Sequence, residues 1–207
     1  MAKIDKVCKK CRRAGQKLFL KGEKCLSAKC PFLRRSYAPG QHGQSGVRLS
    51  EYGRQLREKQ KAAQMYGISE RQFRKYYQKA LQKKGMTDLT LITMLESRLD
   101  NTVFKLGLVN SRRQARNAIR DGHILVNDKK TTSPSFRVKL KDQIEVKKTS
   151  QKKLPFSDIK ESLKKVKTPS WLKLDPAKFT GQALKEPERS EIDTSIDEHL
   201  ILEYFAR

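Results

Sequence analysis

The four cysteines of this chain all lie within its first 30 residues, as two closely spaced pairs. Two residues separate Cys8 from Cys11, four separate Cys25 from Cys30, and thirteen lie between the pairs. This spacing is typical of a tetrahedral zinc site, in which each pair closes a tight loop and four thiolates fill the coordination sphere. Two disulfides or four buried thiols are the alternatives, but disulfides require an oxidising compartment. The pattern therefore predicts a zinc knuckle with one structural ion.

The composition is strongly basic and poor in apolar residues. Only 36% of the 207 residues are hydrophobic and 33% are charged, whereas average globular domains have about 45 to 50% and about 25%. Lysine and arginine number 47 against 22 acidic residues, a net charge of +25 that a polyanion would neutralise. From Glu186 onward, however, there are seven acidic and two basic residues, so this end is expected to contact protein. The excess of basic residues over the whole chain indicates nucleic acid as the main partner.

The sequence contains no signal for a membrane or a secretory route. Residues 1–15 lack the apolar stretch of a secretory signal, and no run of 18 apolar residues occurs. We therefore expect a cytoplasmic protein with no membrane contact, in a reducing compartment that suits thiolate ligands.

Residues 31–48 contain turn residues and no sustained apolar period, which predicts an extended loop. Basic and aromatic side chains on such a loop suit phosphate contacts and base stacking. The expected contacts are Arg12 and Arg13 beside the cysteines, and Arg34, Arg35, Tyr37, His42 and Arg48 on the loop. An ordinary loop histidine is an equally good reading of His42.

Three helices are predicted next, over residues 50–66, 69–85 and about 88–106, and each stops at a glycine. Ser69 and Gln72 fit a capping box at the start of the second. The aromatic residues of that helix are expected in the core rather than as stacking platforms. Basic side chains line the polar faces and are candidates either for RNA contact or for a solvated surface; among them are Arg54, Lys59 and Arg71.

A short arginine-rich helix is predicted over residues 111–122, again with a capping box at its start. Arginines recur every four residues along it, at Arg112, Arg116 and Arg120. Free N–H groups at the helix start and neighbouring guanidinium groups together favour an anion. We expect this face to bind phosphate without contributing to the fold, because the alanines and isoleucine on the other side do the packing. An exposed arginine face with no ligand is the alternative.

The apolar period then changes to two, which predicts antiparallel strands over residues 123–126, 136–140 and 144–146. With the two preceding helices these strands would form a compact unit over about residues 95–150. Near the end of the chain, Asp197 suits a helix N-cap, and Ile201, Tyr204 and Phe205 follow with helical spacing. We expect residues 197–206 to form a helix that docks on the N-terminal helical domain.

Several of these segments together resemble one family. The run SRLDNTVFKLGLVNSRRQARNAIRDGHILVND resembles the S4 RNA-binding domain, and SEYG with YGISERQF resembles the helical domain of the S4 ribosomal proteins. CRRAGQKLFLKG, RRSYAPGQHG and the ending IDEHLILEYFAR extend the similarity over nearly the whole chain. The bacterial, zinc-binding form with four cysteines is the best match. Residues 151–185 depart most from the family, and no site is assigned there.

The resemblance implies an α+β fold: a zinc knuckle (1–35), a mainly helical domain (36–90) completed by residues 176–207, and an S4 RNA-binding domain (91–175) of two helices plus a small antiparallel sheet. It implies a structural constituent of the small ribosomal subunit, not an enzyme, that binds small-subunit ribosomal RNA early in assembly. It also implies neighbouring ribosomal proteins as partners, a place near the path of incoming messenger RNA and a role in translational accuracy, with no small-molecule substrate. By the family pattern, RNA contacts fall on Arg112, Arg113, Arg116, Arg34, Arg35 and Arg48, and His123 follows the DGH motif.

Two functions from other classes are the alternatives. S4 domains also occur in RNA-modifying enzymes, but such an enzyme needs a catalytic domain, and no paired acids, nucleophile or glycine-rich loop stands outside the motif. A zinc-knuckle DNA-binding regulator fits the charge but not the order of the domains. Comparison of binding to structured RNA and to duplex DNA distinguishes the DNA-binding regulator from the ribosomal RNA-binding protein.

Overall fold

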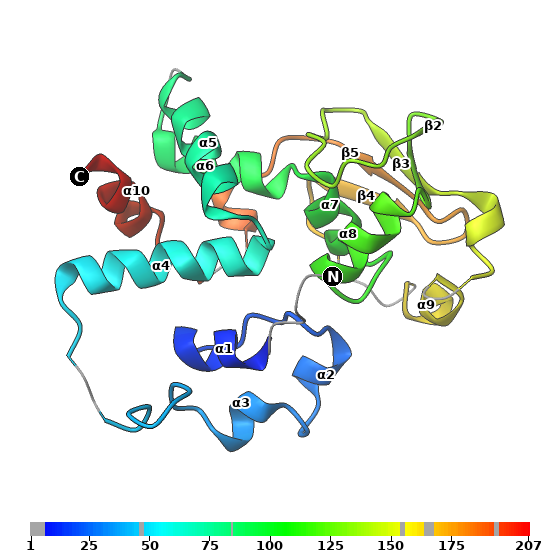
Figure 1. Ribbon diagram of the computed structural model, residues 1–207. Coiled ribbons are helices and arrows are strands. Elements are labelled where there is room, and N and C mark those ends of the chain that lie inside the picture. Colours follow the sequence, from blue (N-terminus) through cyan, green and yellow to red (C-terminus); the bar gives the residue numbers. More distant parts are fainter. Residues whose placement is uncertain (1–6, 46–47, 84, 154–155, 164–167, 193–194) are drawn as a thin grey trace. The chain divides into compact units, whose positions relative to one another are not determined.

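The computed structural model of the chain describes residues 7–45, 48–83, 85–153, 156–163, 168–192 and 195–207 (Figure 1). It divides into two compact units. The first unit comprises Met1–Asp88 together with Thr194–Arg207, and the second comprises Leu89–Asp193. Both ends of the chain therefore belong to the first unit. None of the described helices is long and apolar enough to cross a membrane.

Three short helices lie in the cysteine region of the first unit: α1 (Cys8–Ala14), α2 (Glu23–Leu26) and α3 (Pro31–Arg34), with Cys30 directly before α3. Gly15 ends α1 with a φ of 71°, a left-handed conformation that residues with a Cβ rarely adopt. The buried apolar residues of this region are Leu18 and the cysteines at 11, 25 and 30. Such a small set of apolar side chains makes only a minimal core.

Two longer helices follow, α4 (Glu51–Tyr66) and α5 (Glu70–Leu81), and both start as predicted. The Ser50 hydroxyl accepts a hydrogen bond from the Gly53 N–H at 3.2 Å, and the Ser69 hydroxyl accepts one from the Gln72 N–H at 3.4 Å. These caps satisfy amide groups that have no partner within the helix. Gly67 ends α4 as predicted, whereas α5 ends at Leu81, before the predicted stop at Gly85.

The C-terminal helix α10 (Glu198–Ala206) packs against α4, which confirms the predicted docking of the tail (Figure 1). Asp197 caps it, and its carboxylate accepts hydrogen bonds from the N–H groups of His199 and Leu200. The Phe205 ring lies 4.7 Å from Tyr77 and 5.7 Å from Phe73, measured between ring centroids. These aromatic contacts tie the end of the chain to α5 as well as to α4.

The helix predicted over about residues 88–106 is in fact two helices, α6 (Thr87–Glu96) and α7 (Leu99–Lys105). Arg98 between them has an extended backbone, with ψ at 140°. Residues 134–138 satisfy the backbone at this break: the N–H groups of Leu99 and Asp100 donate to the carbonyls of Phe136 and Pro134, and the Val138 N–H donates to the Ser97 carbonyl. A distant segment thus replaces helical hydrogen bonds, so the apolar spacing alone did not indicate the break.

The second unit continues with α8 (Arg112–Arg120) and a five-stranded antiparallel sheet. Its strands are β1 (Ile124–Val126), β2 (Lys129–Lys130), β3 (Gln143–Val146), β4 (Leu172–Asp175) and β5 (Thr180–Ala183), in the order β2-β1-β3-β5-β4. Asn127 and Asp128 join β1 to β2 with positive φ angles of 50° and 63°, as a tight two-residue hairpin turn requires. The predicted strands at 123–126 and 144–146 are therefore confirmed within one residue.

The strand predicted at residues 136–140 is absent from the described sheet, because this segment bonds the α6–α7 break and makes only an isolated bridge between Arg137 and Arg98. Its place beside β3 is taken by β5, which the sequence analysis did not assign. Residues 176–192 lie in the second compact unit, whereas residues 195–207 belong to the first. The second compact unit thus extends beyond the range 91–175 that was expected for the S4 domain.

The core of the second unit lies between its helices and the sheet. Its buried apolar cluster draws on α7, α8, α9 (Phe156–Leu163), the sheet and Trp171. Gly181 of β5 faces Leu106, and a Cβ at this position would lie 2.4 Å from a Leu106 methyl carbon. Close packing of the leucine therefore requires glycine at this point of the strand. Two short 3-10 turns, Lys148–Ser150 and Arg189–Glu191, complete the described elements.

Candidate nucleic-acid interface

The N-terminus of α8 carries the densest group of arginines in the second unit. The Ser111 hydroxyl caps the helix by accepting from the Gln114 N–H at 3.2 Å, as predicted. Ala115, Ala118 and Ile119 are buried, so the arginines are directed to the other sides of the helix. Arg113 and Arg120 are exposed, whereas Arg112 and Arg116 are half-buried. The helix thus presents two different kinds of arginine.

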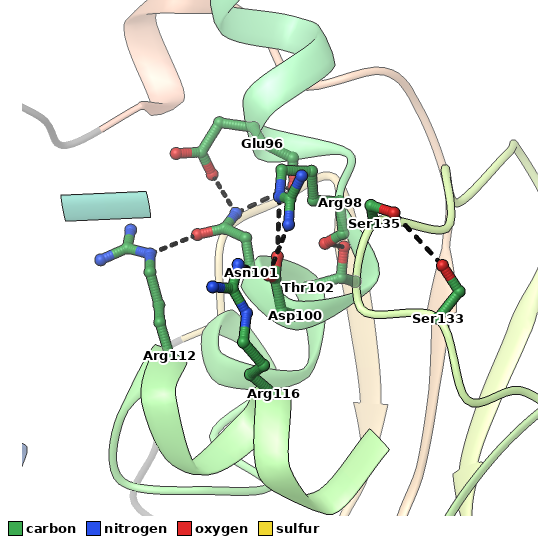
Figure 2. Close-up of polar contacts among 9 residues, drawn as sticks. All are labelled: Glu96, Arg98, Asp100, Asn101, Thr102, Arg112, Arg116, Ser133 and Ser135. Atoms are coloured by element: carbon green, nitrogen blue, oxygen red, sulfur yellow. Dashed lines mark hydrogen bonds and ion pairs between the residues drawn. The ribbon is translucent and has the colours of Figure 1, made fainter. Parts of the chain in front are cut away.

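The half-buried Arg112 is held by α7. Its Nε donates to the Asn101 Oδ1 at 2.7 Å (Figure 2). Its guanidinium carbon lies 4.7 Å from the centre of the Phe104 ring. Asn101 in turn donates from Nδ2 to the backbone carbonyl of Glu96 at 2.9 Å and to its carboxylate at 2.7 Å. Arg112 therefore ends a chain of hydrogen bonds that starts at the C-terminal end of α6.

The half-buried Arg116 is held by a second chain. Its Nη2 lies 2.8 Å from Asp100 Oδ2, and 30% of its side chain is exposed. Arg98 bonds the same carboxylate, with its Nε 3.0 Å from Oδ1 and its Nη2 2.7 Å from Oδ2 (Figure 2). Arg98 and Asp100 are both buried. The expectation that Arg112 and Arg116 take no part in the fold is therefore wrong, since both belong to a network that runs into the protein interior.

His123, singled out through the DGH motif, lies between α8 and β1. Its Nδ1 lies 2.9 Å from the Ser150 hydroxyl, and its ring meets the edge of Phe156 at 6.1 Å between centroids. The side chain is half-buried. These contacts give His123 a clear packing role in addition to its predicted RNA contact.

A second basic site lies at the start of α4 in the first unit. Arg48, Leu49, Arg54 and Arg57 line a hollow of about 410 Å³. All three arginines are exposed, and the N–H groups of the helix start lie nearby in the chain. Arg57 was not among the predicted contacts, although its spacing of three from Arg54 indicates that the two share a helix face.

The remaining predicted contacts of the first unit are more dispersed. Arg12 is partly occupied within the fold: its Nε donates to the Tyr37 carbonyl at 2.9 Å, and its guanidinium stacks over the Tyr37 ring at 4.9 Å. It thereby fixes the loop to α1. The other predicted side chains are exposed, namely Arg13, Arg34, Arg35, His42 and Arg71.

Lys59 differs from every other predicted contact because only 4% of the residue is exposed. Its ammonium lies 2.8 Å from the Glu70 carboxylate and 4.2 Å from the centre of the Tyr204 ring. A charge that is buried between an acid and an aromatic face links α4 to α5 and α10. We therefore assign Lys59 to the packing of the first unit and leave it out of the interface.

The four cysteines are all free thiols; Cys8 is half-buried and the other three are buried. Burial raises the pKa of the Cys11 thiol, and the nearby thiols of Cys25, Cys8 and Cys30 raise this pKa further, against a hydrogen bond from the Leu18 backbone that lowers it. The Lys21 N–H donates to the Cys25 sulfur at 3.3 Å. The described residues contain no group of three or more His, Cys, Asp or Glu side chains arranged to hold a metal ion.

Comparison with known proteins identifies relatives over the whole chain. Two family profiles match it, the ribosomal protein S4/S9 N-terminal domain over residues 2–96 and the S4 domain over residues 97–144. The small ribosomal subunit protein uS4 of Syntrophomonas wolfei is 47% identical over 204 residues, 98% of each chain. That of Acetivibrio thermocellus is 48% identical over 97% of this chain and 96% of its own. The uS4A protein of Clostridium novyi is 48% identical over 99% and 98%, respectively.

Proposed function

Because this chain belongs to the S4 family of bacterial small-ribosomal-subunit proteins, we propose that it binds ribosomal RNA mainly through the arginine face of α8. The protein is a structural constituent of the small subunit in the cytoplasmic ribosome, not an enzyme. The observation that carries the proposal is the paired arrangement at α8, where exposed Arg113 and Arg120 flank guanidinium groups that the fold already holds. Such an array can place several charge-assisted hydrogen bonds on one phosphate backbone.

The basic hollow at the start of α4 is a second RNA contact in this proposal. Three arginines around one hollow suit phosphate oxygens, which accept from guanidinium groups in pairs. The exposed Arg34 and Arg35 extend the same chemistry toward the cysteine region. With a net charge of +25, the protein needs such a polyanion to relieve its own repulsion.

The experiment that tests this proposal is filter binding of the full chain to transcribed small-subunit ribosomal RNA over a range of salt concentrations. Arg120→Ala removes one exposed charge from α8, and Lys178→Ala removes one from the exposed turn between β4 and β5 as a matched control. Each lost phosphate contact should lower the slope of log K against log salt by about 0.7 to 0.9. We expect that change for Arg120→Ala and not for Lys178→Ala. Equal slopes for both variants would show that the arginine face of α8 contributes only nonspecific positive charge. Duplex DNA of equal length serves as the competitor.

We further propose that Cys8, Cys11, Cys25 and Cys30 hold one structural zinc ion. The support is chemical: four cysteines without disulfides, in two closely spaced pairs, stand in a region with little apolar core, and thiolates are the ligands that zinc prefers. Zinc would supply the cross-link that the side chains of this region do not. Metal analysis of protein purified under reducing conditions should find about one zinc per chain. A stoichiometry near zero would contradict the proposal.

An early place in subunit assembly is the remaining part of the proposal. A protein that binds RNA without other proteins must carry its own contacts, and the basic sites on both units meet this condition. The full chain should therefore bind protein-free small-subunit RNA in the filter assay. Binding that requires another ribosomal protein in the mixture would place it later in assembly.

A further inference from the structure

Two buried side chains on α7 support the arginine face of α8 from the inside (Figure 2). We propose that Asp100 and Asn101 are positioning residues for RNA binding, which hold the guanidinium groups of Arg116 and Arg112 in the orientation that phosphate oxygens require. The inference rests on the proposed function, and it adds two residues that cannot themselves reach RNA. Only 2% of Asp100 and 0% of Asn101 are exposed.

Each positioning residue is itself fixed from behind by a buried charged group. Arg98 donates hydrogen bonds to both carboxylate oxygens of Asp100. Glu96 accepts twice from the Asn101 amide, once through its backbone carbonyl and once through its side chain. Arg98 and Glu96 are 1% and 0% exposed. The two chains therefore run in the same order, from a buried charge through a residue of α7 to an arginine of α8.

The break between α6 and α7 makes this arrangement possible. A continuous helix would leave residues 96 to 101 on its successive faces, whereas the extended backbone at Arg98 lets that side chain turn back onto Asp100, two residues later. Asn101 likewise reaches the backbone of Glu96 across the break. The break in the predicted single helix thus allows Arg98 and Glu96 to hold the two positioning residues.

Orientation matters because arginine is a long side chain with many rotamers. A guanidinium group that is fixed before binding loses little conformational freedom when RNA arrives, whereas a mobile one must be ordered at the moment of binding. Arg116 remains 30% exposed while it is held. Asp100 thus fixes the group without removing it from solvent.

A simpler reading makes Asp100 a structural ion pair that neutralises Arg116, and the two readings predict opposite signs for RNA affinity. Asp100→Asn removes a negative charge, so charge alone would strengthen binding to RNA. Loss of positioning should instead weaken it about 2- to 10-fold, the cost of ordering one freed side chain. Asp121→Asn is the matched control: the same change, at an exposed residue directly after α8, which should leave affinity equal or slightly stronger.

Asp100→Asn also leaves the buried Arg98 without its carboxylate, so folding must be verified by circular dichroism and by titration of the RNA-binding fraction. A second pair of variants avoids this difficulty. Arg116→Lys and Arg120→Lys both keep the charge, and each is compared with its own alanine variant. Lysine cannot reproduce the fixed planar contact, so it should recover little of the affinity lost in Arg116→Ala, whereas at the exposed Arg120 it should recover most.

The decisive measurement is a double-mutant cycle with Asp100→Asn and Arg116→Ala, read as affinity for transcribed small-subunit RNA. If Asp100 acts through Arg116, its substitution should have no further effect once Arg116 is alanine. Additive losses, or stronger binding by Asp100→Asn alone, would overturn the positioning role; should Asp100→Asn fail to fold, equal recovery by lysine at both arginines would overturn it. If Arg116→Ala and Arg120→Ala bind like the parent, it is the proposed RNA face that fails.

Discussion

Among the described residues, those at 7–35 bury one aliphatic side chain, Leu18, and three cysteines, whereas the second unit packs twenty apolar side chains into one cluster. Both regions carry basic side chains for which we propose RNA contact, so the difference lies in what holds those side chains in place. In the second unit a hydrophobic core and a buried polar network do so. In the cysteine region the burial is too small for this, and the zinc ion that we propose would supply the missing cross-link. Similar basic surfaces can therefore depend on different kinds of interior.

The largest expected effect separates these two interiors. Cys11→Ser, or a zinc chelator, should remove most of the hydrogen-exchange protection of residues 7–35 and leave that of residues 89–193 unchanged, because a structural zinc site contributes about 10 to 16 kcal/mol to the folded state of small domains. Hydrogen exchange followed by mass spectrometry measures both regions in one sample. Unchanged protection at residues 7–35 after chelation would mean that the region is ordered without metal.

A substitution in the hydrophobic core should affect only the second unit. Leu99→Ala empties a fully buried position next to the network and should lower the free energy of unfolding by about 2 to 5 kcal/mol. Leu140→Ala, at a residue that is 52% exposed, should change it by less than about 0.5 kcal/mol. Denaturant titration measures both variants, and zinc content should stay at the parent value in each. Loss of zinc in Leu99→Ala would show that the two interiors are not independent.

The helical part of the first unit offers an intermediate case, because its order depends on the docked tail. Phe205→Ala removes ring contacts with Phe73 and Tyr77 and should destabilise the first unit by about 1 to 3 kcal/mol, at about 0.5 to 1.5 kcal/mol for each aromatic pair. Thermal melting monitors the loss. Parent-like melting would indicate that α10 contributes no stability to α4 and α5.

The smallest effect concerns the cap of that tail. Asp197→Ala removes the carboxylate that accepts from two N–H groups at the start of α10 and should cost about 1 kcal/mol. Asp197→Asn keeps an accepting oxygen and should recover most of this loss. If both variants melt together, the cap is replaced by water or by neighbouring groups.

Local signals in the sequence were sufficient for the starts of α4, α5, α8 and α10. Ser50, Ser69, Ser111 and Asp197 each cap a helix through an N–H group within three residues, so the information lies within one turn. The interruption at Arg98 could not be predicted in this way, because its hydrogen-bond partners lie at residues 134–138. The strand β5 was missed because its inward positions are Gly181 and Ala183, which give no apolar period.

The candidate RNA interface shows the same difference between local signals and contacts with distant segments. Arginine spacing correctly identified the basic face of α8, but it gave no indication that Arg112 and Arg116 are tied to α7. Their partners lie 11 and 16 residues earlier on another helix. Lys59 was misplaced for a related reason, since the Tyr204 ring that covers it comes from the far end of the chain. Contacts between distant segments decide which basic residues remain available to RNA.

Ultraviolet cross-linking of the full chain to small-subunit ribosomal RNA, with mapping of the linked peptides, shows whether α8 and the start of α4 bind that RNA. We expect cross-links in peptides that cover residues 34–57 and 112–123, and none in the acidic tail at residues 195–207. Cross-links that fall on the tail, or that are absent from the α8 peptide, would contradict this expectation.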